Sequence, residues 1–247
     1  MSALRKLSLI VPAFNEEKLL GETLSQINHA ARVVTSRGWQ TELIVCDNNS
    51  TDGTAAIAQA AGARVVFEPV NQIARARNRG AEEATGSWLC FIDADSLPSA
   101  ALFSRTLDAI ESTRFVAIGT TLQFDNVPWY IRVIAQAWKG WSLFLSHMAG
   151  SFVVVDARAF RELGGFSDEF FVGEEVDLSV RLKKWGKQQS SVRAVKVLRG
   201  VPLRTSGRKA HLYSARENGR FLWRVMTSPF RTMKRKEDCD IWYDGRR

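Results

Sequence analysis

A short apolar run that ends in two aspartates constrains this chain more than any other feature. Residues 88–92 read Trp-Leu-Cys-Phe-Ile, and Asp93, Ala94 and Asp95 follow directly. An apolar run of this length and composition predicts a buried strand of a parallel sheet. Ligands of open α/β sheets bind beyond the carboxyl ends of the strands, where the two aspartates are expected. Carboxylates there need a counter-ion, and they suit Mg²⁺ or Mn²⁺, whose remaining positions phosphate oxygens often fill.

The same residues also have a purely structural explanation. A strand that ends in Asp followed by Ser can simply lead into a turn or cap a helix. The pair by itself therefore leaves a metal–nucleotide site and a structural turn equally open.

Two further predicted strands end close to a carboxylate. Residues 7–12 are followed by Glu16, and residues 42–47 end at Asp47. A predicted helix that ends near residue 37 follows the first strand, and a second at 55–61 follows the next. A short strand is predicted at 64–67, and a third helix at 74–84 follows it. This alternation predicts an α/β fold, with a Rossmann-like, mostly parallel central sheet flanked by helices. In such a sheet the carboxylates at the strand ends line one edge.

The segment after the first predicted strand excludes two common nucleotide sites. A dinucleotide-binding fold would carry Gly-x-Gly-x-x-Gly there, and a P-loop is also rich in glycine. This chain instead has Pro12, Ala13, Phe14, Asn15 and Glu16. A nucleotide would have to be held by carboxylates, a metal and cations.

Composition limits the partners. The 247 residues include 34 Lys and Arg against 26 Asp and Glu, which gives a net charge of +8 and suits anionic ligands or an anionic membrane face. No known nucleic-acid motif accompanies the charge, so nucleic acid is not an expected partner. Cys46 and Cys90 lie in strand-like runs, which favours buried, reduced thiols and therefore a cytoplasmic location. The positive charge extends this expectation to the inner face of the membrane. Neither a signal peptide nor a membrane-spanning run is recognisable.

The second half contains an unusually apolar predicted helix at residues 129–148. Trp129, Trp138 and Trp141 leave it a wide apolar surface. Its polar residues recur at helical spacing on one face, and they are Arg132, Gln136 and Lys139. Two interpretations remain open, namely packing in the core and contact with a membrane interface or an acceptor lipid.

Acidic residues are concentrated at the start of another predicted helix. Glu174, Glu175 and Asp177 follow Gly173, and carboxylates in a first turn complement the helix dipole. That effect accounts for one or two of them, but three within four positions exceed what capping requires. The sequence predicts that this helix ends at Gly186.

A basic, turn-prone segment at residues 204–211 is either a solvated loop or a cover for phosphates. Arg208 would then be a donor-binding residue, and His211 is either structural or a metal ligand. From residue 212 to about 226, a predicted helix carries a row of arginines at positions 216, 220 and 224. This helix and the basic-aromatic residues after it fit a solvated face, a membrane-surface element or a partner site.

Five motifs in the correct order resemble family 2 of the inverting nucleotide-sugar glycosyltransferases, which have the GT-A fold. They lie at residues 11–17, 47–54, 76–80, 93–95 and 164–181. The resemblance covers about residues 7–210. It implies one GT-A domain over residues 1–211, followed by a helical extension at 212–247. The donor nucleotide would occupy the half up to about residue 98, and the acceptor the half from 99 to 211.

The resemblance also implies roles for individual residues. Glu16 and Asp47 would contact the nucleoside, and Arg75 or Arg77 would lie near the base or the diphosphate. Asp95, together with Asp93, would hold Mn²⁺ or Mg²⁺. The remaining donor-binding positions expected from the motifs are Pro12, Phe14, Asn49 and Ala94.

The candidate catalytic base follows from the same comparison of motifs. The family usually has Glu-Asp where this chain has Glu174 and Glu175, so Glu175 is the candidate base and Asp177 the reserve. No Gln-x-x-Arg-Trp motif of processive synthases is present, which favours transfer of one sugar to a hydroxyl acceptor. The basic tail favours an acceptor that is lipid-linked or close to a membrane.

Two other functions are weighed against this one. A sugar-nucleotide pyrophosphorylase would need a glycine-rich, arginine-bearing loop after the first strand, which the sequence lacks. A catalytically degenerate module that binds nucleotide sugars or docks on a membrane remains the alternative. The sequence predicts no oligomeric state.

Overall fold

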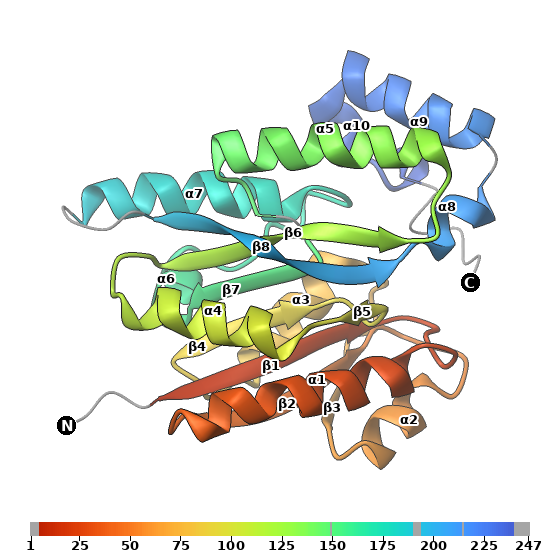
Figure 1. Ribbon diagram of the computed structural model, residues 1–247. Coiled ribbons are helices and arrows are strands. Elements are labelled where there is room, and N and C mark those ends of the chain that lie inside the picture. Colours follow the sequence, from red (N-terminus) through yellow and green to blue (C-terminus); the bar gives the residue numbers. More distant parts are fainter. Residues whose placement is uncertain (1–4, 149, 190–193, 214, 240–247) are drawn as a thin grey trace.

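Eight strands form one sheet at the centre of the computed structural model, which describes residues 5–148, 150–189, 194–213 and 215–239 (Figure 1). Their order across the sheet is β3-β2-β1-β4-β7-β6-β8-β5. The strands are β1 (Lys6–Ala13), β2 (Gln40–Asp47), β3 (Arg64–Phe67), β4 (Trp88–Ile92), β5 (Ser96–Leu97), β6 (Ala117–Asp125), β7 (Phe152–Asp156) and β8 (Val195–Ser206).

The sheet is mostly parallel, as predicted. β1 pairs in parallel with β2 and β4, β2 with β3, and β6 with β8. β7 runs antiparallel between β4 and β6, and the short β5 runs antiparallel to β8. The ends of β1, β2 and β4 therefore meet at one edge, where Ala13 lies beside Asp47. The beginning of β7 and the end of β8 reach the same edge.

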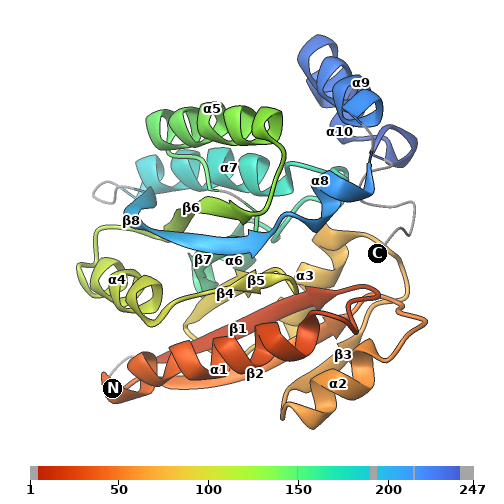
Figure 2. The same cartoon turned by 45° about the vertical axis from the view of Figure 1, so that its right-hand side comes forward.

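Helices cover both faces of the sheet. In the described residues the helices are α1 (Leu20–Ser36), α2 (Thr54–Ala60), α3 (Ile73–Glu82), α4 (Ala100–Glu111), α5 (Trp129–Leu145), α6 (Ala157–Glu162), α7 (Glu174–Gln188), α8 (Arg208–Leu212), α9 (Ala215–Thr227) and α10 (Pro229–Met233), followed by the 3-10 turn η1 (Lys236–Asp238). Of these, α1, α2 and α4 contribute to the core on one face, and α3, α6 and α7 to the core on the other. Strand side chains alternate between the faces, and this alternation divides the core in two. Leu9 and Val11 pack with α1 and α4, whereas Ile10 packs with α3 and, through neighbouring strands, with α6 and α7 (Figure 2).

Several predicted elements differ from the observed ones. The helix α4 and the strand β5 were not predicted. β8 extends through Ser206 and α8 starts at Arg208, so the segment expected to be a loop at 204–211 is strand and helix. Sequence periodicity did not indicate a strand here, because β8 lies near the edge of the sheet, paired with β5 and β6, and can keep a charged side chain such as Arg204 exposed. α7 continues past Gly186 to Gln188.

The core-packing interpretation of the apolar helix is wrong. α5 lies beside α7 on the outside of the molecule (Figures 1 and 2), and Ser142 is its one buried residue. Trp129 is 77% exposed and Phe144 is 86% exposed. Among the residues that the structure describes, no helix combines the length and the apolar character needed to cross a membrane.

The predicted helix in the C-terminal extension is confirmed as α9. The segment after it returns to the loop that precedes α7, where the Phe171 amide donates to the Met233 carbonyl at 2.7 Å. The Lys234 ammonium pairs with Glu169 and lies 5.0 Å from the centre of the Phe170 ring. Cys46 and Cys90 are buried thiols outside any disulfide, as predicted.

Two helical glycines provide a matched test of how α3 packs on the sheet. A Cβ atom on Gly80 would lie 2.5 Å from Cγ2 of the buried Ile10, whereas nothing lies within 4 Å of a Cβ on Gly140. We expect Gly80→Ala to lower the free energy of unfolding by about 1–3 kcal/mol through overpacking. Gly140→Ala should raise it by about 0.5–1 kcal/mol through helix propensity. Urea denaturation measures both changes, and equal effects would contradict this packing.

Candidate active site

The end of β4 carries the two aspartates that the sequence singled out. The Asp93 amide donates to the Ser151 carbonyl at the start of β7, at 3.3 Å. The end of β8 holds Asp95, because the Ser206 amide donates to its carbonyl at 3.1 Å and the Thr205 hydroxyl to its Oδ1 at 3.3 Å. The aspartates thus have different neighbours, although one residue separates them.

Arg77 connects the Asp93 side chain to α7. This arginine is 1% exposed, its Nη2 donates to Asp93 Oδ1 and to the Gly150 carbonyl at 2.8 Å each, and its Nη1 pairs with Glu174. Burial alone would lower the pKa of Arg77, but the carboxylates Asp93 and Glu174 raise it above its usual range, so the guanidinium stays charged. The motifs suggested Arg75 or Arg77 as the residue near the base or diphosphate. In the structure Arg77 is buried and contacts the carboxylates Asp93 and Glu174.

The first turn of α7 presents Glu174 and Glu175 to this arginine. Gly173 starts the helix with a φ of 84°, which favours glycine. Burial raises the pKa of Glu174, against the opposing charge of Arg77. Burial, followed by the negative charge of Glu174, raises the pKa of Glu175 to about 8. Glu175 Cδ would lie 3.3 Å from a Cβ placed on Gly150, so the glutamate lies close to the start of β7.

Asp177 has a structural environment. Its Oδ2 accepts a hydrogen bond from Arg181 Nε at 2.7 Å. The same arginine donates to the carbonyls of Leu163 and Gly165 at 2.9 and 2.7 Å. Asp177 therefore fixes α7 against the preceding turn, and the geometry favours Glu175 as the residue available for proton transfer.

The predicted nucleoside contacts lie at the ends of β1 and β2. Asp47 Oδ1 accepts from the Ser50 amide at 3.0 Å, which closes the turn after β2. Arg208 Nη2 donates to both carboxylate oxygens of Glu16 at 2.8 Å, so the start of α8 is joined to the loop after β1. The donor-binding candidates Pro12 and Ala94 are buried, Phe14 is half-buried and Asn49 is exposed.

Arg75 is the candidate cation with an exposed side chain. It is 40% exposed, and it pairs with Glu68 at 3.2 Å and with Asp168 at 3.9 Å. It therefore lies close to the loop that leads into α7.

A cavity of about 370 Å³ lies beside Asp95. Asp125, Arg208 and His211 also line it. Carboxylate oxygens are ligands that Mn²⁺ and Mg²⁺ prefer, and oxygens of a bound diphosphate would fill further coordination positions beside the cationic side chain. The residues present therefore fit Mn²⁺ or Mg²⁺. His211 Nε2 contacts the Asn126 carbonyl. Within the described ranges, no three His, Cys, Asp or Glu side chains are grouped closely enough to hold a metal by themselves.

Sequence reasoning missed several residues that position the site. Asn48 is 4% exposed; its Nδ2 donates to the carbonyls of Glu68 and Val70, and its Oδ1 accepts from the Gln72 amide. Gln72 Nε2 in turn donates to the Asp168 carbonyl at 2.6 Å. Neither residue has a periodic signal. Glu174 was recognised in an acidic cluster and in the Glu-Asp motif of the family, but its pairing with the distant Arg77 leaves no local pattern.

Comparisons with known proteins agree with this geometry. The model of the family described as "Glycosyl transferase family 2" matches residues 8–161. A dolichol-phosphate mannosyltransferase of Pyrococcus furiosus is 29% identical over 143 residues, which is 53% of this chain and 38% of that protein. The glycosyltransferase AglE of Haloferax volcanii is 30% identical over 129 residues, 50% of this chain and 41% of that protein. The chain thus spans about two fifths of these curated relatives.

Solved structures share the fold. A mannosyltransferase of Pyrobaculum calidifontis, in complex with GDP-Man and Mn²⁺, superposes with a TM-score of 0.66 at 18% identity, covering 92% of this chain and 62% of that one. The glucosyl-3-phosphoglycerate synthase of Mycobacterium tuberculosis, in complex with Mn²⁺, UDP and glucosyl-3-phosphoglycerate, gives a TM-score of 0.57 at 22% identity, covering 82% of this chain and 70% of that one. These similarities show the GT-A fold.

The buried arginine can be tested by unfolding experiments. Arg77→Met would leave Glu174 buried without its partner, and we expect it to lower the free energy of unfolding by about 3–5 kcal/mol. The double variant Arg77→Met/Glu174→Leu should recover part of that loss. The control is Arg75→Met, whose pair is partly exposed and should contribute less than about 1 kcal/mol. A single variant at Arg77 as stable as the control would contradict the account.

Proposed function

The chain belongs to glycosyltransferase family 2, as its motifs predicted, and we propose that it transfers one sugar from a UDP- or GDP-sugar to an acceptor hydroxyl with inversion at the anomeric carbon. One observation carries the proposal. Arg77 holds Asp93, at the end of β4, and Glu174, in the first turn of α7, on one guanidinium. This connection supports a single site that contains Asp93 and Glu175, the neighbour of Glu174.

The aspartates would bind the donor through a metal. We assign Asp95, with Asp93, as ligands of Mn²⁺ or Mg²⁺. The ion would stabilise the charge that develops on the departing nucleoside diphosphate. Arg208, which lines the same cavity, adds positive charge, and Asp47 lies at the strand end where the nucleoside is expected.

Glu175 would act on the acceptor. With a pKa raised to about 8, it is a stronger base than an ordinary carboxylate, so it can accept the proton of the attacking hydroxyl. The hydroxyl oxygen forms a bond to the anomeric carbon, and the bond from that carbon to the diphosphate oxygen breaks. Because attack and departure are on opposite faces of the sugar, a single displacement inverts the centre.

The relatives support the substrate class. Their printed names and complexes include GDP-Man, UDP and UDP-GlcNAc, and one relative is named for dolichol phosphate. We propose that the acceptor of this chain is lipid-linked or close to a membrane, and that transfer takes place at the cytoplasmic face. The exposed Arg216 and Arg220 of α9 fit an anionic surface next to such an acceptor.

Donor and metal binding can be measured by thermal shift. The panel is UDP, GDP, CDP and dTDP, each with and without Mn²⁺. We expect one nucleotide to stabilise the protein in a metal-dependent way, by about 2.7 kcal/mol at a hundred times its Kd. Asp95→Ala should abolish the shift, and the control Glu82→Gln, an exposed acid on α3 that does not line the cavity, should retain it. Stabilisation without metal dependence would contradict the assigned ligands.

Turnover distinguishes the two acidic candidates on α7. We expect Glu175→Gln to lower kcat by about 10²–10⁴-fold and to leave nucleotide binding intact, because it removes the base. Asp177→Asn should lose much less activity. A base is active when deprotonated, so kcat/KM should rise with pH towards about 8 and then level off. Full turnover of the Gln variant would remove Glu175 from this role.

The alternative of a degenerate binding module has a separate outcome. Metal-dependent nucleotide binding by the parent protein, with neither transfer nor donor hydrolysis for any nucleotide sugar tested, would favour it over an enzyme.

A further inference from the structure

α5 exposes an apolar face that nothing in the described structure covers. We call it the α5 apolar face, and its exposed residues are Trp129, Val133, Trp138, Trp141, Phe144 and Leu145. The centres of the Trp138 and Trp141 rings lie 4.8 Å apart, so part of the face is a cluster of aromatic rings. A contiguous exposed apolar surface usually marks an interaction site.

The helix divides into three strips. At about 100° per residue, the apolar face covers one side, and the side with the buried Ser142 faces inward. A third strip contains Arg132, Gln136 and Lys139, and the same spacing continues to Leu143. An apolar strip beside a cationic strip is the pattern of a helix that lies in the interface of a membrane.

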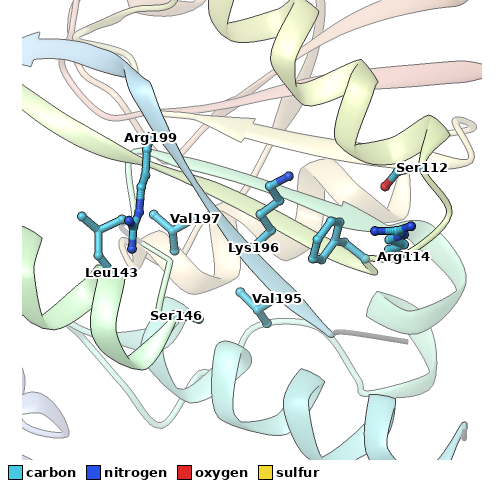
Figure 3. Close-up of a pocket in the computed structure, with 9 residues that line it drawn as sticks. Ser112, Arg114, Leu143, Ser146, Val195, Lys196, Val197 and Arg199 are labelled. Carbon is cyan, nitrogen blue, oxygen red and sulfur yellow. The ribbon is translucent and has the colours of Figure 1, made fainter. Parts of the chain in front are cut away.

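Leu143 leads from this strip into a basic groove. The groove has a volume of about 430 Å³ and lies between α5, the loop after α4 and the start of β8. Figure 3 shows Arg114, Lys196 and Arg199 around it. The Lys196 ammonium lies 4.8 Å from the centre of the Phe115 ring, which holds this cation in place.

The charge around both features has one sign. Residues 126–155 contain no Asp or Glu, although they contain Arg132 and Lys139. The described residues that line the groove include three cations and no carboxylate. An anionic partner is therefore complementary to the groove, and an apolar one to the helix beside it. Anionic phospholipids in a bilayer combine both properties.

We propose that α5 docks this protein on an anionic membrane surface. The α5 apolar face enters the interface between headgroups and acyl chains, and the groove around Arg199 binds the phosphate of a lipid headgroup. A helix of 17 residues is about 25 Å long, which suits a surface rather than a single acyl chain. Tryptophan side chains are enriched at membrane interfaces because one part of the ring system is apolar and the N–H is polar.

The position of α5 relates this surface to the candidate active site. β6 ends at Asp125, which lines the cavity beside Asp95, and α5 begins at Trp129, four residues later. The helix thus runs from the edge of the site to the basic groove. Docking of α5 on a membrane would bring the site to the membrane-proximal acceptor, so the role of docking rests on the proposed function. Vesicle binding requires no turnover, however, so failure of docking and failure of transfer can be distinguished.

The test is co-flotation of the full chain with vesicles. One set is pure phosphatidylcholine, and in the other phosphatidylglycerol replaces part of it. We expect binding to the anionic set that weakens with added NaCl. Phe144→Asp should weaken it by about tenfold or more, because it removes a large apolar side chain and adds negative charge. The control Phe67→Asp makes the same change at an exposed site on β3, at the far end of the sheet, and should bind normally.

The groove has its own pair of variants. Arg199→Glu should weaken binding to the anionic vesicles, whereas Arg32→Glu, a charge reversal at an exposed site on α1, should not. Thermal unfolding and the nucleotide-induced shift, both without vesicles, confirm that each variant is folded. Absence of vesicle binding by the parent protein, or equal losses in Phe144→Asp and Phe67→Asp, would overturn the proposal. A dimer in light scattering that Phe144→Asp returns to monomer would also overturn it, since a second copy would then cover α5.

Discussion

The ion pairs of the buried Arg77 are the interaction on which the candidate site depends. Its guanidinium reaches Asp93 at the end of β4, Glu174 at the start of α7 and the carbonyl of Gly150 before β7. A buried charge needs compensating partners, and removing one of them would leave an unpaired charge in the interior, so the three segments depend on one another in the folded state. The same contacts bring Asp93, at the end of β4, next to Glu174, in the first turn of α7.

Electrostatics then separate the roles of neighbouring carboxylates. Glu174 pairs with Arg77. Burial is the main cause of the raised pKa of Glu175, and the negative charge of Glu174 raises it further. Asp177 pairs with Arg181, which also donates to carbonyls of the turn before the helix and so stabilises it. Three acids within one helical turn thus have three different environments: Glu174 pairs with Arg77, Glu175 has a raised pKa, and Asp177 pairs with Arg181. Local environment, not residue type, assigns these roles.

Much of this arrangement was predictable from the sequence, and the rest depends on long-range contacts. Apolar runs ending in Asp47 and Asp93 predict the parallel strands and their common edge, because strand periodicity is a local signal. The exposure of α5 was not predictable, since an apolar helix looks alike whether a core or a membrane covers it. Neither were the pairs of Arg77 with Glu174 and of Arg208 with Glu16, which join residues far apart in the sequence. Such contacts follow from topology, and no spacing in the chain records them.

The central claim is that Asp95, with Asp93, binds a divalent metal that holds the donor diphosphate, and that Glu175 faces the acceptor. A crystal structure with Mn²⁺ and the nucleoside diphosphate selected by the protein, recorded at a wavelength where manganese scatters anomalously, tests it most directly. The account predicts one strong anomalous peak at about 2.1 Å from a carboxylate oxygen of Asp95, in contact with the diphosphate. It also predicts Glu175 on the side of the site that remains open to an acceptor. A bound nucleotide with no manganese at Asp95, or with the metal held elsewhere, would contradict it.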